Sequence, residues 1–168
     1  MRRKDREITD RAEIESILTK AAVCRIGLAD GGEPYIVPLC FGYENGAVYL
    51  HSAPEPSENL HGSRASSPKG SDGKKMAMIR KNPRCCFEVD ICDKLIRSEK
   101  ACSWGMRYRS VIGFGNAEIL TGPEEKRHGL NRIMQHYGGG SHDFSGKDLD
   151  SVTVIRIRLE SITGKKHA

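Results

Sequence analysis

The sequence predicts a mainly β protein of the α+β class, an antiparallel barrel of about six strands with two or three helices inserted. Three observations carry this prediction. Apolar and polar residues alternate in several short segments, as in strands with one buried face. Glycine turns at 30–32 and 45–46 join such segments into hairpins. The strands follow one another without the strand–helix rhythm that builds a parallel sheet.

Length and composition set the class of protein. A chain of 168 residues, 38% of them hydrophobic and 29% charged, fits a single domain over 1–168. No run of 18 apolar residues exists, so we expect no membrane span. The charged first residues lead into no apolar segment, which predicts a cytoplasmic protein without a secretory signal.

The first half of the chain begins with a helix. Asp10 is a typical N-cap and Glu13 completes the pattern of a capping box, before apolar residues recur at helical spacing. Three strands are then predicted, over 23–29, 34–43 and 47–52. The second contains Pro34 and Pro38, which favour a sheet edge or a bulge because proline cannot donate to a ladder.

A change of texture separates the two halves. The segment Pro56–Asp72 is rich in Ser, Gly and Pro, and we expect a mobile surface loop there. A short helix over 73–81 follows. Another helix starts at Pro123 and ends at the glycines of 138–140. The remaining strands are predicted over 84–91, 108–120 and 151–159.

Charge and cysteine usage exclude several kinds of site. The net charge of +5 suits an anionic ligand but is too scattered to indicate nucleic-acid binding. The six cysteines form no CxxC pair and no zinc-type cluster with His, so no metal site is predicted. In a reducing compartment we expect no disulfides, and most of the cysteines lie in apolar strand-like segments, where they are interpreted as small structural hydrophobes rather than as redox groups. No dinucleotide, P-loop, serine-elbow or zinc-protease motif is present.

Lys74 and Lys75 are the most informative residues. They stand at the start of a predicted helix, where the positive end of the macrodipole makes each lysine unfavourable by roughly 0.3–1 kcal/mol. An anion bound there would offset that cost, because helix N-terminal amides and two ammonium groups form a phosphate site. A first turn with two solvated lysines is the other interpretation.

The strand end His51-Ser52-Ala53 lies directly upstream of that helix in the chain, once the intervening loop is set aside. Its polar groups would then converge with the two lysines on one ligand. His51 is a candidate catalytic residue on this argument. A structural histidine at a strand end is the alternative.

The residues also resemble a known family. The resemblance is carried by the segments ITDRAEIESIL, VCRIGLADGGEPYIVPLCFGYENGAVYLHSA, GKKMAMIRKNPRCCFEVD and CSWGMRYRSVIGFGNAEIL. In this order and spacing they are similar to the pyridoxamine 5′-phosphate oxidase-related FMN-binding split-barrel proteins, nearest the nitroimidazole-resistance flavoproteins. The resemblance implies a six-stranded split barrel and a homodimer that binds FMN at the subunit interface.

The resemblance also implies roles for particular residues. Main-chain groups of the strand segment 38–40 would hydrogen-bond the flavin ring. The strand end 51–53 would lie beside the ribityl and phosphate groups, and the two lysines at the helix start would bind the phosphate. The strand segment 108–110 would also contact the flavin region, either from the same chain or from the partner chain. The implied cofactor-binding residues are Pro38, Leu39, Cys40, His51, Ser52, Ala53, Lys74, Lys75, Arg109 and Ser110.

The segment 56–72 departs from the family pattern, which has only a couple of residues between HSA and GKK. It either loops out of an intact site or covers and displaces the cofactor; loop closure costs little enough to favour the first. The implied function is an FMN-dependent oxidoreductase acting on a small nitroaromatic or quinone-like substrate. Two alternatives remain: a flavin, haem or deazaflavin binding or sensing protein without turnover, and a structural dimer that has lost the cofactor.

Overall fold

The computed structural model describes residues 3–54 and 73–167. The predicted loop over 56–72 lies outside these residues. The helices are α1 (Arg11–Lys20), α2 (Lys74–Lys81), α3 (Pro123–His136) and α4 (Gly146–Asp150), with 3-10 turns η1 (Lys4–Arg6) and η2 (Ala101–Ser103). The strands are β1 (Glu7–Ile8), β2 (Cys24–Asp30), β3 (Glu33–Leu39), β4 (Phe41–Glu44), β5 (Ala47–Ser52), β6 (Arg84–Ile96), β7 (Gly105–Leu120) and β8 (Thr153–His167).

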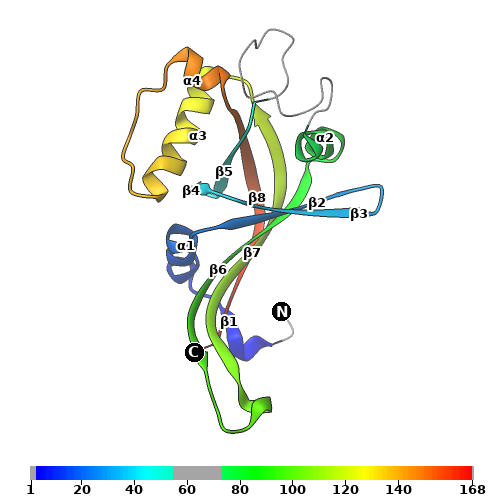
Figure 1. Ribbon diagram of the computed structural model, residues 1–168, viewed down its shortest axis with the longest axis vertical. Helices are drawn as coiled ribbons and strands as arrows, with labels where there is room; N and C mark the ends of the chain where they lie inside the picture. The colour runs from blue at the N-terminus through cyan, green and yellow to red at the C-terminus, as the bar shows by residue number, and fades with distance from the viewer. Residues whose placement is uncertain (1–2, 55–72, 168) are drawn as a thin grey trace.

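One antiparallel sheet holds all the strands, in the order β3-β2-β6-β7-β8-β5-β4, with β1 added beside β8 (Figure 1). The strands curve around a common core, and the mainly β split barrel that the sequence predicted is confirmed. Among the described residues the sheet has eight strands rather than six. The two additional strands are β1 and the piece produced when the predicted strand over 34–43 divides.

That division falls at Cys40, which joins β3 to β4. β3 pairs with β2 at one edge of the sheet, whereas β4 pairs with β5 at the opposite edge. The chain therefore passes between the two edges across one residue, and this passage is the split of the barrel. Pro34 and Pro38 lie on the edge strand β3, where the absence of a backbone donor is tolerated, as predicted.

The core lies between the concave side of the sheet and the first two helices. Its largest fully buried side chains include Phe41, Phe87 and the apolar residues of α1, Ile17 and Leu18. A second, smaller cluster lies under α3 and contains Tyr49 and Ile133 among others. Burial of these side chains supplies the main free energy that holds the helices against the sheet.

The helix α1 begins where the sequence predicts. Asp10 caps it, because its Oδ1 accepts a hydrogen bond from the Ala12 amide at 2.9 Å. The predicted capping box is wrong, because the Glu13 carboxylate instead accepts from the Lys166 ammonium at 2.8 and 2.9 Å. Glu13 thus ties α1 to the last strand.

A close contact seats α3 on the outer strands. An added Cβ at Gly42 of β4 would lie 2.4 Å from the backbone carbon of Arg132, so only glycine permits this approach. Glu44, two residues further on, accepts from Arg132 Nη1 at 2.5 Å and lies 2.9 Å from His128 Nε2. These contacts fix the position of the helix over β4 and β5.

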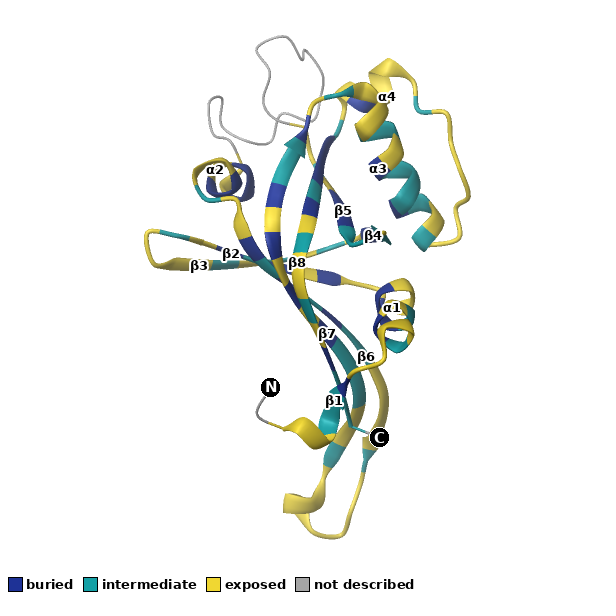
Figure 2. Ribbon diagram, turned by 180° about the vertical axis from the view of Figure 1, so that it is seen from behind, coloured by how far each residue is buried: buried dark blue, intermediate teal, exposed yellow. Residues whose placement is uncertain are grey.

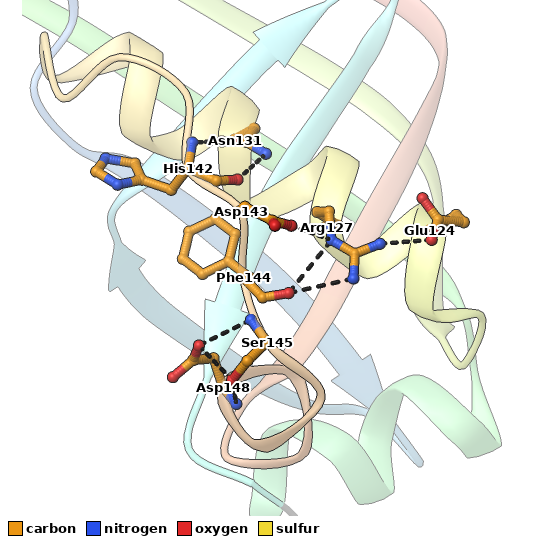
Figure 3. A network of polar contacts seen from close by, with 8 residues as sticks. All are labelled: Glu124, Arg127, Asn131, His142, Asp143, Phe144, Ser145 and Asp148. Carbon is orange, nitrogen blue, oxygen red and sulfur yellow. Dashed lines mark hydrogen bonds and ion pairs between the residues drawn. The ribbon is translucent and has the colours of Figure 1, made fainter.

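The loop between α3 and α4 is held against α3 by side chains of the helix (Figure 3). The Asn131 amide donates to the carbonyl of His142 and accepts from its N–H, at 3.0 and 2.7 Å. Arg127 donates to the carbonyl of Phe144 from two nitrogens. A capping box that the sequence analysis did not predict, between Ser145 and Asp148, then begins α4.

The hairpin of β6 and β7 projects beyond the rest of the chain (Figure 2). Both strands are longer than predicted. On β6, most of the residues after Ile91 are exposed. Trp104 closes the tip, because its indole N–H donates to the carbonyl of Ser98 at 2.6 Å. Across the described ranges, no helix has the length and apolar character needed to span a membrane.

Candidate functional site

The first turn of α2 contains a buried lysine. Gly73 occupies the N-cap position without a side-chain cap, and the first turn contains no acidic residue. Lys75 is only 9% exposed, and burial lowers the pKa of its ammonium group. Within residues 3–54 and 73–167, no hydrogen bond or ion pair joins this ammonium to another side chain. The ammonium is therefore partly desolvated, and no side chain among the described residues matches its charge.

Lys74, its neighbour, has a different environment. Its ammonium forms an ion pair with Glu33 of β3 and lies 4.9 Å from the centre of the Tyr35 ring. About half of its side chain is exposed, 49%. The sequence analysis assigned the two lysines one common role, whereas the structure separates them: one is matched at the surface and the other is buried.

The end of β5 lies against the start of β8, where Ser52 pairs with Thr153 and His51 with Val154. His51 is exposed, while Thr153 is, with Lys75, one of the polar side chains that are buried among the described residues. The pKa of the His51 imidazole is lowered, first by partial burial and second by the positive charge of Lys75. The structure thus brings His51 within electrostatic range of Lys75, as the sequence predicted, and favours the neutral imidazole.

The predicted flavin-side strand lies at the joint between β3 and β4. Pro38 and Cys40 are exposed, and Leu39 packs against the core. The joint is held by Tyr137, whose hydroxyl donates to the carbonyl of Ala22 at 2.8 Å and accepts from the Phe41 amide at 3.2 Å. Tyr137 is the C-cap of α3, so the end of this helix reaches the joint, a contact that was not predicted from the sequence.

Arg109 and Ser110 lie elsewhere on the sheet. Arg109 donates two hydrogen bonds to the Asp93 carboxylate, at 2.6 and 3.0 Å, so its charge is already matched. The row of paired residues that contains His51 reaches β7 at Leu120, ten residues beyond Ser110. Ten residues of strand span roughly 30 Å. One chain therefore does not bring these two residues to His51 and Lys75.

The described part of the chain shows no arrangement of side chains suited to metal binding or to thiol chemistry. No group of three His, Cys, Asp or Glu side chains is arranged there to hold a metal ion. All six cysteines are free thiols. Burial raises the pKa of Cys24 and of Cys85 to about 12, which keeps both protonated and unreactive.

Comparisons with known proteins agree with this architecture. A family model described as pyridoxamine 5′-phosphate oxidase matches residues 10–69 and 66–166. The crystal structure of a proposed 5-nitroimidazole antibiotic resistance protein from Bacteroides thetaiotaomicron is 34% identical in sequence. That match has a TM-score of 0.76 and covers 95% of this chain and 86% of the other. A search of the curated proteins gave no match.

Two more distant structures share the fold. The flavocytochrome Anf3 from Azotobacter vinelandii is 19% identical with a TM-score of 0.77, over 100% of this chain and 72% of that one. The FAD and heme binding protein from Mycobacterium smegmatis is 17% identical with a TM-score of 0.75, over 96% and 73%. The family model spans most of the sequence and the identity to the Bacteroides protein extends over nearly all of it. The chain therefore belongs to the pyridoxamine 5′-phosphate oxidase-related split-barrel family.

Proposed function

We propose that this chain is a flavoprotein that binds FMN and transfers electrons to a small substrate such as a nitroaromatic or quinone-like compound. The observation that carries the proposal is the buried Lys75 at the first turn of α2, next to His51 and without a described counter-ion. A desolvated ammonium is costly unless an anion accompanies it. The phosphate of FMN would supply that anion, in a single cytoplasmic domain formed by residues 1–168.

The residues near Lys75 fit the phosphate end of the cofactor. Lys75 offers a charged donor, and the free amides at the start of α2 offer neutral donors on the positive end of the helix dipole. The Ser52 hydroxyl and the backbone of Ala53 lie at the adjacent strand end and would bind the ribityl chain. We assign no phosphate contact to Lys74, because Glu33 already matches its charge.

The flavin ring would lie along Pro38, Leu39 and Cys40, where the exposed edge of β3 leaves main-chain groups free of a second strand. When bound, the flavin supplies the hydride or electron transfer. The chain would bind the ring and exclude water from it, with the neutral His51 on the ribityl side of the cofactor, near Lys75. A neutral imidazole can accept a proton from a ligand, which is the catalytic role we propose for His51.

Titrations with FMN and riboflavin test this assignment. Lys75→Ala should weaken FMN binding by 10- to 100-fold, since a hydrogen bond to a charged group contributes about 1.5–3 kcal/mol. Riboflavin lacks the phosphate, so its affinity should not change. The matched control Lys74→Ala should alter FMN affinity less than about threefold, as expected for an exposed ion pair. Equal losses for FMN and riboflavin would remove the phosphate site from Lys75. Equal FMN-specific losses for the two lysines would instead show that Lys74 also contacts the phosphate, despite its ion pair with Glu33.

We further propose a homodimer, assembled through an apolar face of the sheet. Ile36, Ile112 and Phe114 are 69%, 45% and 44% exposed on it. Ile36 and Phe114 lie in one row of paired residues, with Gly27 and Cys86 between them. Such a continuous exposed apolar patch is typical of an interface between subunits. A second copy would also bring its own Arg109 and Ser110 toward the flavin, which one chain does not achieve.

The oligomeric state can be measured directly. The double substitution Ile36→Lys and Phe114→Lys should convert a dimer of the 18.6 kDa chain into a monomer in light scattering. Ala12→Lys, a charge introduced at an exposed residue of α1 rather than of the sheet, should leave the dimer intact. A wild-type monomer that binds FMN fully would contradict the proposal.

Haem or deazaflavin binding is the second candidate function. The similarity in fold to a flavocytochrome and to an FAD and heme binding protein favours haem as the group to exclude first. The absorption spectrum of the purified protein distinguishes the cases, because haem gives a Soret band and oxidised flavin absorbs near about 450 nm. Mass spectrometry of the released cofactor separates FMN from a deazaflavin.

A further inference from the structure

The C-terminal end of α3 lies beside the start of β4 (Figure 1). A Schellman motif ends the helix there. The Gly138 amide donates to the carbonyl of Gln135 at 3.1 Å, and the Gly139 amide donates to that of Met134 at 2.8 Å. Gly138 has a φ of 78°, which glycine adopts without strain. The helix end is therefore sharply defined, and it holds Tyr137, its C-cap, at one position.

The Tyr137 hydroxyl bridges two segments that are distant in the sequence. It donates to the carbonyl of Ala22, two residues before β2, at 2.8 Å, and it accepts from the amide of Phe41, the first residue of β4, at 3.2 Å. His136 adds a second link, because its Nε2 lies 2.7 Å from the Ala21 carbonyl oxygen and its ring centre lies 4.3 Å from that of Phe41. The end of α3 thus joins the entrance of β2 to the entrance of β4.

The backbone bonding of the sheet is interrupted at the same place. The ladder of β3 ends at Leu39 and the ladder of β4 begins at Phe41, so Cys40 between them belongs to neither. Pro38 has no amide hydrogen to donate. β3 is also an edge strand, paired on one side only. The hydroxyl of Tyr137 therefore acts where the sheet itself holds the chain least.

We propose that Tyr137 is a positioning residue for the flavin ring, because its hydroxyl fixes segment 38–40, whose main-chain groups would lie along that ring. The inference rests on the proposed function, but it concerns the ring rather than the phosphate assigned to Lys75. A segment already held in its binding position costs less to order when the ligand binds. Without the hydroxyl, the segment would occupy that position for a smaller fraction of the time, and the apparent affinity would fall by that fraction.

Tyr137→Phe keeps the aromatic ring and removes only the hydroxyl. FMN and riboflavin share the flavin ring, so both affinities should fall by the same factor, about three- to tenfold, as expected for the loss of one hydrogen bond. Lys75→Ala should weaken FMN binding alone. The matched control is Tyr43→Phe on β4, whose hydroxyl accepts from Arg11 Nη2 at 3.3 Å and makes no bridge to β2. Its affinities for both ligands should equal those of the wild type.

The reduction potential of the bound flavin gives a readout that overall stability does not move. It should become more negative in Tyr137→Phe, because displaced main-chain donors stabilise the added charge of the reduced ring less well. In Tyr43→Phe the potential should stay unchanged. Unchanged flavin affinities in Tyr137→Phe, a loss confined to FMN, or equal losses in the two tyrosine variants would each overturn the inference while leaving the assignment of Lys75 in place.

Amide hydrogen exchange of the protein as purified tests the positioning without any ligand titration. Peptides that cover 36–42 should exchange several-fold faster in Tyr137→Phe than in the wild type, whereas peptides from β7 should not change. Equal exchange in the two proteins would overturn the inference. A wild type that binds neither flavin would instead overturn the proposed function, and the exchange comparison would then still decide whether Tyr137 fixes the segment.

Discussion

The two ends of this molecule both gather positive charge, but they do so in different environments. At the α2 end, Lys75 is buried and its pKa is lowered by desolvation. At the hairpin end, Lys94, Arg97 and Arg107 remain exposed to water. A buried cation destabilises the ligand-free protein, because its desolvation cost is offset only when an anion binds. An exposed cation stays hydrated and costs little free energy without an anion. A bound anion would therefore stabilise the α2 end much more than the hairpin end.

The largest expected effect on stability comes from a substitution that disturbs the packing of α3 and leaves the hairpin end unchanged. Gly42→Ala would force a Cβ against the backbone of Arg132 and displace α3 from β4 and β5. We expect a loss of about 1–3 kcal/mol in the free energy of unfolding, measured by urea denaturation. Gly146→Ala, where an added Cβ meets nothing within 4 Å, is the control and should be neutral or slightly stabilising.

A second variant sharpens the contrast in desolvation. Lys75→Met removes a buried charge without a described counter-ion, so the flavin-free protein should gain about 1 kcal/mol in stability. The gain should be greatest near neutral pH. Wild-type stability should rise with pH above the lowered pKa of Lys75, because the unfolded state binds more protons there, and the difference should shrink accordingly. Thermal melts between pH 7 and pH 10 measure both; a difference that does not vary with pH would contradict the buried-charge explanation.

The hairpin end should respond more weakly and in a salt-dependent way. Lys94→Gln removes one of two cations, Lys94 and Arg107, that pair across the ladder, and should stabilise the protein by about 0.2–1 kcal/mol at low salt. Because these groups are exposed, added salt should abolish the gain. Melts at two ionic strengths test this, and a gain that survives in 1 M salt would point to a cause other than repulsion.

The smallest effect is expected at Lys74. Its ion pair with Glu33 is half-exposed, and exposed pairs contribute about 0–1 kcal/mol. Lys74→Ala should therefore lower the melting temperature only slightly in the same assay. A loss as large as that of Gly42→Ala would mean that the contact with Glu33 and Tyr35 fixes α2 on the sheet.

The elements with strong local signals were predictable. The Asp10 cap, the two glycine hairpins and the edge location of Pro34 and Pro38 all follow from single residues whose backbone chemistry allows few conformations. The division at Cys40 was not, because it depends on which distant strand each half meets. The apolar pattern continues across Cys40 without interruption. The capping box predicted for Glu13 was wrong for the same reason, because its carboxylate binds Lys166, which is distant in the sequence.

The candidate site was predictable in place but not in detail. The sequence located the cationic start of α2 and the polar end of β5. It did not distinguish Lys74 from Lys75, although a signal exists: Lys75 lies three and four residues before Met78 and Ile79, on the buried face of the helix. The pairing of Lys94 with Arg107 had no such signal, because it depends on the register between two long strands.

The two prolines of β3 have a consequence for assembly. An edge strand normally offers a row of backbone donors to any other chain that approaches. Pro34 and Pro38 remove two of them, so strand addition along this edge is impaired, while Ile36 between them remains exposed on the flat side. Association is thereby directed to the face of the sheet. Contacts between faces can close after two copies, whereas contacts between edges can continue into a fibre.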